Sequence, residues 1–130
     1  MKESYFENDY IQLWIEDGIV YEVFKPNSKS LDLENAKIVV RDRLKVSNQV
    51  SRPLFVDLCN LLSADMDARK YMAKGEALHY LNATAILVKN QLSKLLAEIY
   101  IRINKPAIPT KFFSNKNEAI HWLEKYKYMN

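Results

Sequence analysis

Glycine and cysteine are scarce in this chain. Its 130 residues include only two glycines, Gly18 and Gly75, and a single cysteine, Cys59. Two glycines so far apart cannot build a glycine-rich phosphate loop. A lone cysteine excludes an internal disulfide and a cysteine-based metal site. The low content of glycine and proline also argues against disorder, so we expect an ordered domain.

Long apolar runs and a strong charge of one sign are also missing. No stretch approaches the roughly 20 apolar residues of a membrane span, and the opening MKESYFEND has no apolar run of signal-peptide length. The 19 basic residues nearly balance 16 acidic ones, for a net charge of +3, and both signs alternate along every segment. We therefore expect a cytoplasmic soluble protein with no integral membrane segment and no nucleic-acid partner.

Catalytic and metal-binding motifs are not found either. His79 and His121 have no ligand partners at metal-binding spacing. Cys59 or Ser63 could be paired with His79 as a nucleophile, but no elbow motif supports such a pair. The sequence therefore predicts no catalytic residue, no cofactor and no metal.

Acidic residues cluster after the central apolar strand. Asp57 ends that strand, and Asp65 and Asp67 follow it. Such carboxylates bind Mg²⁺ or accept a phosphoryl group in receiver domains, where a late lysine, here Lys89, completes the site. The hairpin that opens this chain does not fit that topology, so we interpret the aspartates as helix caps.

Alternating strand and helix patterns are what the chain does have. Residues 10–15 and 19–24 alternate as strands around Asp17-Gly18, a strong hairpin signal. The next predicted elements are a helix over 32–47, a strand over 54–58 and a helix that starts at Ser63 to Asp65 and breaks near Gly75. After these we predict a strand over 83–88, a helix from Asn90 or Gln91 to Lys105, a strand over 109–113 and a helix capped by Asn115. This order, β-β-α-β-α-β-α-β-α, predicts a single α/β domain over residues 1–130, with a five-stranded, mainly parallel sheet, an antiparallel edge strand and about four helices.

Apolar periodicity selects the expected core. We predict that Phe55, Val56, Ile86, Val88, Leu96 and Trp122 are buried. The inner stripes of the helices are expected at Leu33, Ala36, Val40 and Leu44, then at Leu92, Leu95, Leu96, Ile99 and Ile103, and finally at Ala119, Trp122, Leu123 and Tyr126.

Three stretches carry a family resemblance: VDLCNLLSADMDAR, ATAILVKN and IPTKFFSNKNEAIHWLEKY. With the order of elements, they resemble the STAS domain, named for sulfate transporters and bacterial anti-sigma-factor antagonists. The chain looks closest to small stand-alone bacterial STAS-like proteins, which are related to the lipid-transfer fold. The resemblance runs from Tyr10 to Tyr126 and implies that fold.

The resemblance also implies a regulatory serine. Anti-sigma-factor antagonists are phosphorylated on a serine at the start of the helix after the central strand, and Ser63 lies at about that place. The family pattern is usually Asp-Ser-Ser-Gly, whereas this chain reads Leu62-Ser63-Ala64-Asp65. Asp65 and Asp67 would oppose a phosphate. A helix-capping serine and a phosphosite are therefore both kept as interpretations.

Three functions follow from these observations. The first is a non-enzymatic regulatory or protein-binding module of STAS-like fold, with an interaction loop formed by Asn60, Leu61, Leu62, Ser63, Asp65 and Met66. The second is a carrier of a small apolar ligand or lipid, held between the helices and the sheet. The third is an enzyme of unknown chemistry.

A homodimer is also predicted. Aromatic residues gather near both ends of the chain, at Tyr5, Phe6, Tyr10, Tyr126 and Tyr128, and can form a self-association surface. The strand over 10–15 would leave an unprotected sheet edge, which invites pairing with another copy.

Overall fold

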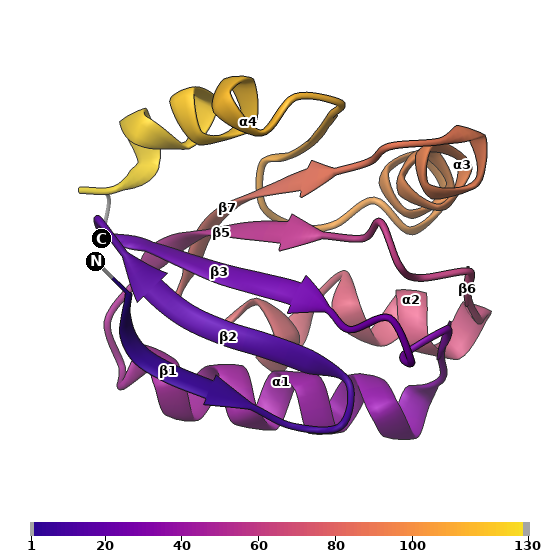
Figure 1. The fold of residues 1–130 in the computed structure, drawn as a ribbon, viewed down its shortest axis with the longest axis horizontal. Helices are drawn as coiled ribbons and strands as arrows, with labels where there is room; N and C mark the ends of the chain where they lie inside the picture. Colours follow the sequence, from indigo (N-terminus) through magenta and orange to yellow (C-terminus); the bar gives the residue numbers. More distant parts are fainter. Residues whose placement is uncertain (1, 129–130) are drawn as a thin grey trace.

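A six-stranded sheet forms the centre of the computed structural model, which describes residues 2–128 (Figure 1). Its strands lie in the order β1 (Glu3–Glu7), β2 (Ile11–Glu16), β3 (Ile19–Phe24), β5 (Arg52–Asp57), β7 (Leu81–Leu87) and β8 (Thr110–Phe113). The first three strands pair antiparallel, and β3, β5, β7 and β8 pair parallel. The carboxyl ends of four strands therefore meet at one end of the sheet.

Helices cover both faces of this sheet. They are α1 (Leu33–Ser47), α2 (Met66–Met72), α3 (Gln91–Ile99) and α4 (Lys116–Leu123), with short helical turns η1 (Gly75–Leu78), η2 (Tyr100–Asn104) and η3 (Glu124–Tyr126). Two-residue strands β4 (Ser30–Leu31) and β6 (Ser63–Ala64) pair parallel beside the main sheet. In Figure 1, α1 and α2 lie on one face and α4 lies on the other. None of the described helices is long and apolar enough to cross a membrane.

The predicted α/β class, the opening hairpin and the sequential strand order are confirmed, but the five-strand count is wrong. The extra strand is β1, which pairs antiparallel with β2 and forms the edge of the sheet. The strand expected at the edge, β2, is therefore the second strand of the sheet. Every side chain of β1 is exposed, and Ser4 has a φ of 54° at an irregular register. An irregular strand with Tyr5 and Phe6 adjacent and both exposed gives no apolar alternation to read. The homodimer stays a prediction, and the edge it would use is now β1.

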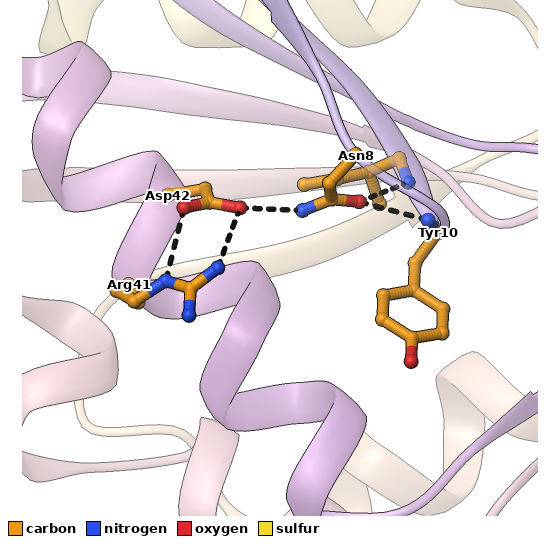
Figure 2. Close-up of polar contacts among 5 residues, drawn as sticks. Asn8, Tyr10, Arg41 and Asp42 are labelled. Atoms are coloured by element: carbon orange, nitrogen blue, oxygen red, sulfur yellow. Dashed lines mark hydrogen bonds and ion pairs between the residues drawn. The ribbon is translucent and has the colours of Figure 1, made fainter.

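A polar junction fixes the β1–β2 turn to α1 (Figure 2). The Asn8 side-chain oxygen accepts hydrogen bonds from the backbone N–H groups of Tyr10 and Ile11, at 2.8 and 3.0 Å. Its amide donates to Asp42 at 2.8 Å, and Arg41 pairs with the same carboxylate at 3.1 Å. Burial alone would raise the pKa of Asp42, but the hydrogen bonds from Arg41 and Asn8 outweigh it and lower that pKa. The buried carboxylate is therefore kept charged and satisfied.

The core is divided by the sheet. On the side of α1 and α2, the buried cluster includes Leu13, Val20, Phe24, Val39, Leu54 and Val56. On the side of α4, it includes Trp14, Tyr21, Phe55, Ala85 and Leu123. Phe55, Val56, Ile86 and Val88 are buried as predicted.

Two residues predicted as core are only half-buried, Leu96 and Trp122. Ser93 and Ala97 are the buried residues of α3, so Leu96 lies at the border of its inner face. Trp122 packs beside Phe113 and Tyr126 at ring distances of 5.7 and 5.1 Å. Its large ring therefore covers the flank of α4, while Leu123 fills the interior.

Replacing Phe55 with alanine should lower the free energy of unfolding by roughly 3–5 kcal/mol, because it removes a buried ring and leaves a cavity. Trp122→Ala should cost clearly less, since part of that ring already contacts water. Urea denaturation at an unchanged slope measures both values. Equal losses in the two variants would contradict this assignment of the core.

Candidate functional site

The predicted interaction loop is divided between the core and the surface. The Asn60 amide donates to the Phe24 carbonyl at 3.0 Å, which fixes the loop to the end of β3. Leu61 is buried in the cluster under α1 and α2. Leu62 and Met66 are 51% and 56% exposed. The loop therefore holds two outward-facing apolar side chains on a firmly attached backbone.

Ser63 does not cap the following helix. It lies in β6, opposite Ser30 of β4, and the two hydroxyl groups are 3.1 Å apart. Asp65 is the N-cap of α2, because its side chain accepts a hydrogen bond from the Ala68 N–H at 2.9 Å. The capping interpretation of Ser63 is wrong, since a capping residue must directly precede the first helical turn. Its phosphorylation stays a prediction.

A cavity of about 80 Å³ lies between the sheet and the helices on the α1 side. Its lining comes from the strands β3 to β7, from the loop after β5, and from the helical segments α1, α2, η1, α3 and η2. The lining residues are Glu22, Phe24, Leu31, Arg43, Leu54, Val56, Leu58, Leu61, Ala64, Arg69, Met72, Ala77, Leu78, Leu81, Thr84, Ile86, Leu96 and Tyr100. Most of these side chains are apolar. Met72 and Leu96 line it, whereas Met66 faces solvent.

A buried ion pair sits in the wall of this cavity. Glu22 of β3 alternates with Val20 and Phe24, so it points toward the helices with them. Arg43 of α1 donates from one terminal nitrogen to Glu22 Oε1 at 3.0 Å, and from the other to the Ala77 carbonyl. Both residues are 1% exposed. Within residues 2–128, Glu22 Oε2 and Arg43 Nε have no hydrogen-bond partner.

Burial governs the ionisation of the groups around the pair. It raises the pKa of Glu22 above the ordinary value, and the charge and hydrogen bond of Arg43 offset this only in part. Burial also raises the pKa of Tyr100, whose hydroxyl donates to the Met72 carbonyl at 2.7 Å. Tyr100 therefore stays neutral and joins η2 to the end of α2.

Cys59 is not activated as a nucleophile. Burial, a hydrogen bond with Asp57 and the charge of Asp57 raise the pKa of its thiol to about 12. Asp57 itself accepts a hydrogen bond from the Cys59 N–H at 2.8 Å. That bond gives the aspartate a structural role at the end of β5, as is common for Asp in turns.

The apolar residues of α3 and η2 form an exposed surface, which we call the α3 surface: Leu92, Leu95 and Ile103. Leu95 is 53% exposed and Ile103 is 69% exposed, so their prediction as an inner stripe is wrong. Ser93 lies on the inner side of α3, and its hydroxyl accepts hydrogen bonds from the N–H groups of Lys89 and Asn90 at 2.9 and 3.1 Å. With the bond from the Ser93 N–H to the Asn90 side chain, they form a capping box at the start of α3. Ser93 and Ala97 are the buried residues of this helix, so Leu92 and Leu95 point outward.

The order of the sheet and the placement of its helices define a SpoIIAA-like α/β protein. The structure resembles that of an uncharacterised protein of the DUF3478 family with a SpoIIAA-like fold, from Shewanella loihica PV-4. The TM-score is 0.56 at 15% sequence identity, over 91% of this chain and 98% of the other. This likeness confirms the predicted STAS-like fold.

The chain belongs to the family described as a domain of unknown function, DUF7793, whose model matches residues 13–127. A comparison with curated proteins gave no match. The family match covers most of β2, every strand from β3 onward and all four helices. It therefore includes the cavity, the ion pair and the α3 surface.

Glu22 and Arg43 were missed as site residues, although the sequence contains a signal for each. Glu22 shares the inward face of its strand with Val20 and Phe24. Arg43 follows the buried Ala36 by seven residues, which is two helical turns. A carboxylate and a guanidinium on two facing apolar surfaces predict a buried pair once the strand and helix are known to pack together.

Removing one member of the buried pair should be costly. Arg43→Met leaves the Glu22 carboxyl group buried without its partner and should destabilise the fold by roughly 3–5 kcal/mol. The double variant E22L/R43M should recover most of that loss, because apolar replacements of buried pairs are often neutral or stabilising. Urea denaturation of the wild type, both single variants and the double variant measures the coupling. A double variant as unstable as the sum of the singles would overturn the pairing.

Ser63 and Asp65 should differ in their effect on stability. Asp65→Ala removes the cap of α2 and should cost about 1 kcal/mol. Ser63→Ala removes one exposed contact with Ser30 and should cost less than about 0.5 kcal/mol. Thermal or urea melts of the two variants check the order, and the reverse order would mean that Ser63 is the cap.

Proposed function

We propose that this protein is a non-enzymatic module that binds a protein partner through the α3 surface. The observation that supports this is the exposure of Leu92, Leu95 and Ile103 on one short helical segment. Single exposed apolar residues are ordinary, but a group of them on one element is typical of an interaction site. Leu62 and Met66 add two further exposed apolar side chains from the interaction loop.

The loop and α3 border the same region of the molecule. Leu61 and Ala64 line the cavity from one side, and Leu96 and Tyr100 line it from the other. Both elements lie at the end of the sheet to which β3 and β5 point (Figure 1). Open α/β sheets usually bind ligands and partners at the carboxyl ends of their strands, which supports a shared binding region here.

Charge favours an acidic partner. The segment from Lys89 to Lys105 carries four exposed cations, Lys89, Lys94, Arg102 and Lys105, and one half-buried acid, Glu98. A partner segment with apolar side chains flanked by carboxylates would complement both features. Two copies of this surface would bring cations together, which argues against its use between identical chains.

The cavity favours a module over a lipid carrier. Pockets for drug-sized ligands measure roughly 300–1,000 Å³, whereas this cavity measures about 80 Å³. A lipid chain does not fit that volume. The polar groups nearby also favour a non-enzymatic role, because Glu22 and Arg43 pair with each other and the Cys59 thiol has a pKa of about 12.

Serine substitutions on the α3 surface test this proposal. The probe is a fluorescent amphipathic peptide of leucine and glutamate, compared with the same peptide carrying lysine for glutamate. The wild type should bind only the acidic peptide, and less tightly at high salt. Leu95→Ser and Ile103→Ser should each weaken that binding at least about fivefold, as expected for interface residues worth 1 kcal/mol or more.

Val50→Ser is the matched control, because Val50 is also exposed, at 45%, but lies in the connection before β5. It should leave peptide binding unchanged. All three variants should melt like the wild type, since their side chains already contact water. Equal binding of the acidic and basic peptides, or equal binding by the Leu95 and Val50 variants, would overturn the proposed surface.

A further inference from the structure

We infer that the partner segment docks on the α3 surface as an α-helix, with one apolar side chain inserted into a hollow on the outer face of α3 and with carboxylates beside it. This inference rests on the proposed function, because it specifies the conformation of the segment that the α3 surface binds.

The hollow is open to solvent and belongs to a single helix. Its lining residues are Gln91, Leu92, Lys94, Leu95 and Glu98. Four of them, at positions 91, 94, 95 and 98, follow the spacing i, i+3, i+4 and i+7. Four neighbouring residues of one helix form the hole that receives a side chain of a facing helix when two helices pack side by side. The outer face of α3 therefore has a shape that a second helix can fill.

Exposed leucines make one side of this hollow apolar. Leu92 is 39% exposed and Leu95 is 53% exposed. Ile99 is half-buried and follows Leu92 by seven residues, so the three residues continue one stripe along the helix. Apolar stripes with this spacing are the faces that amphipathic helices bury against each other. Covering the two leucines would remove apolar surface from water, which favours association.

Contacts on the inner side of α3 fix the position of the hollow. Ser93 and Ala97 are the buried residues of the helix, and Ser93 forms a capping box with Asn90. The Tyr100 hydroxyl donates to the Met72 carbonyl at 2.7 Å and so ties the next turn to α2. A partner therefore meets a face that is already arranged for binding, which lowers the entropic cost of association.

The charges around the hollow specify the flanks of the partner. Lys94 lies at its rim, and Arg102 follows two turns further along; both are exposed. Glu98 lies four residues from each of them and is half-buried, so the two cations outnumber the acid on this face. Carboxylates three or four residues from the inserted side chain would complement Lys94 and Arg102.

An extended segment has no backbone to pair with at this surface. Within an α-helix the N–H and C=O groups bond to one another along the axis, so the outer face of α3 presents side chains only. A partner strand would instead pair with an edge of the sheet, at β1 or β8. A helix satisfies its own backbone groups, and its side chains can interdigitate with those of α3.

Two peptides of identical composition test the conformation. Both contain the same numbers of leucine, glutamate and alanine residues and are about as long as residues 91–104. One places leucine at alternating steps of three and four residues, and the other places it at every second position, as in a strand. The helical pattern should bind, and its Cα chemical shifts should move to α-helical values on binding. The alternating pattern should bind at least about tenfold more weakly.

Filling the hollow tests the insertion. Gln91→Phe adds a ring to the hollow but keeps its charges and both leucines, so it should weaken binding of the helical peptide at least about fivefold. A flat apolar patch would instead bind more tightly with an added ring. Ala107→Phe is the matched control, because Ala107 is exposed and lies beyond η2, outside the hollow. It should leave binding unchanged, and both variants should melt like the wild type.

The outcomes separate this inference from the proposed function. Equal binding of the two peptides, or helical-peptide binding that is unchanged or tighter in Gln91→Phe, would overturn the inference and leave the proposed function intact. Binding of neither peptide would overturn both. Self-association of the peptide-free protein that Gln91→Phe abolishes would identify a second copy as the occupant, which would also overturn the inference.

Discussion

The buried pair of Glu22 and Arg43 is the constraint on which the arrangement of this fold depends. It joins the middle of β3 to α1, and through the Ala77 carbonyl it also joins η1. Apolar side chains packed between a helix and a sheet tolerate small shifts, but a guanidinium fork must meet its acceptors in a fixed geometry. Because desolvating both charges is costly, any sliding of α1 along the sheet would lose the hydrogen bonds that offset that cost. The pair therefore sets the register of α1 more strictly than the leucines and valines around it.

The cavity follows from the same pair. Glu22 and Arg43 occupy positions on the facing apolar surfaces of β3 and α1, where branched aliphatic side chains would otherwise interdigitate. Their polar ends need room for directed hydrogen bonds, and the surrounding positions include the small side chains of Ala64 and Ala77. Tyr100 closes one side by donating to the Met72 carbonyl. Incomplete packing and unpartnered polar atoms therefore occur together beside the same buried pair.

Local sequence patterns predicted where the helices and strands lie better than they predicted which side of each helix is buried. The Asp17-Gly18 turn and the cap at Asn115 lie where the sequence places them, because each depends on a few adjacent residues. The orientation of α3 could not be predicted in this way. Its apolar periodicity favours burial of Leu92 and Leu95, but Ser93 and Ala97 are its buried residues and those leucines point outward. Periodicity measures which side of a helix is apolar, whereas the contacts of the helix with the preceding connection and the sheet decide which side is covered.

The outward turn of α3 also places part of the cavity wall and an exposed apolar surface on one helical segment. Leu96 and Tyr100 face the cavity, while Leu95 and Ile103 face solvent. Any movement of this segment would change the cavity wall and the outward surface together. The Tyr100 hydrogen bond to Met72 limits such movement, because α3 cannot shift from the sheet without breaking it or carrying the end of α2 along. The bond therefore joins the outer helical segment to the inner wall of the cavity, and it presents the α3 surface in a fixed position.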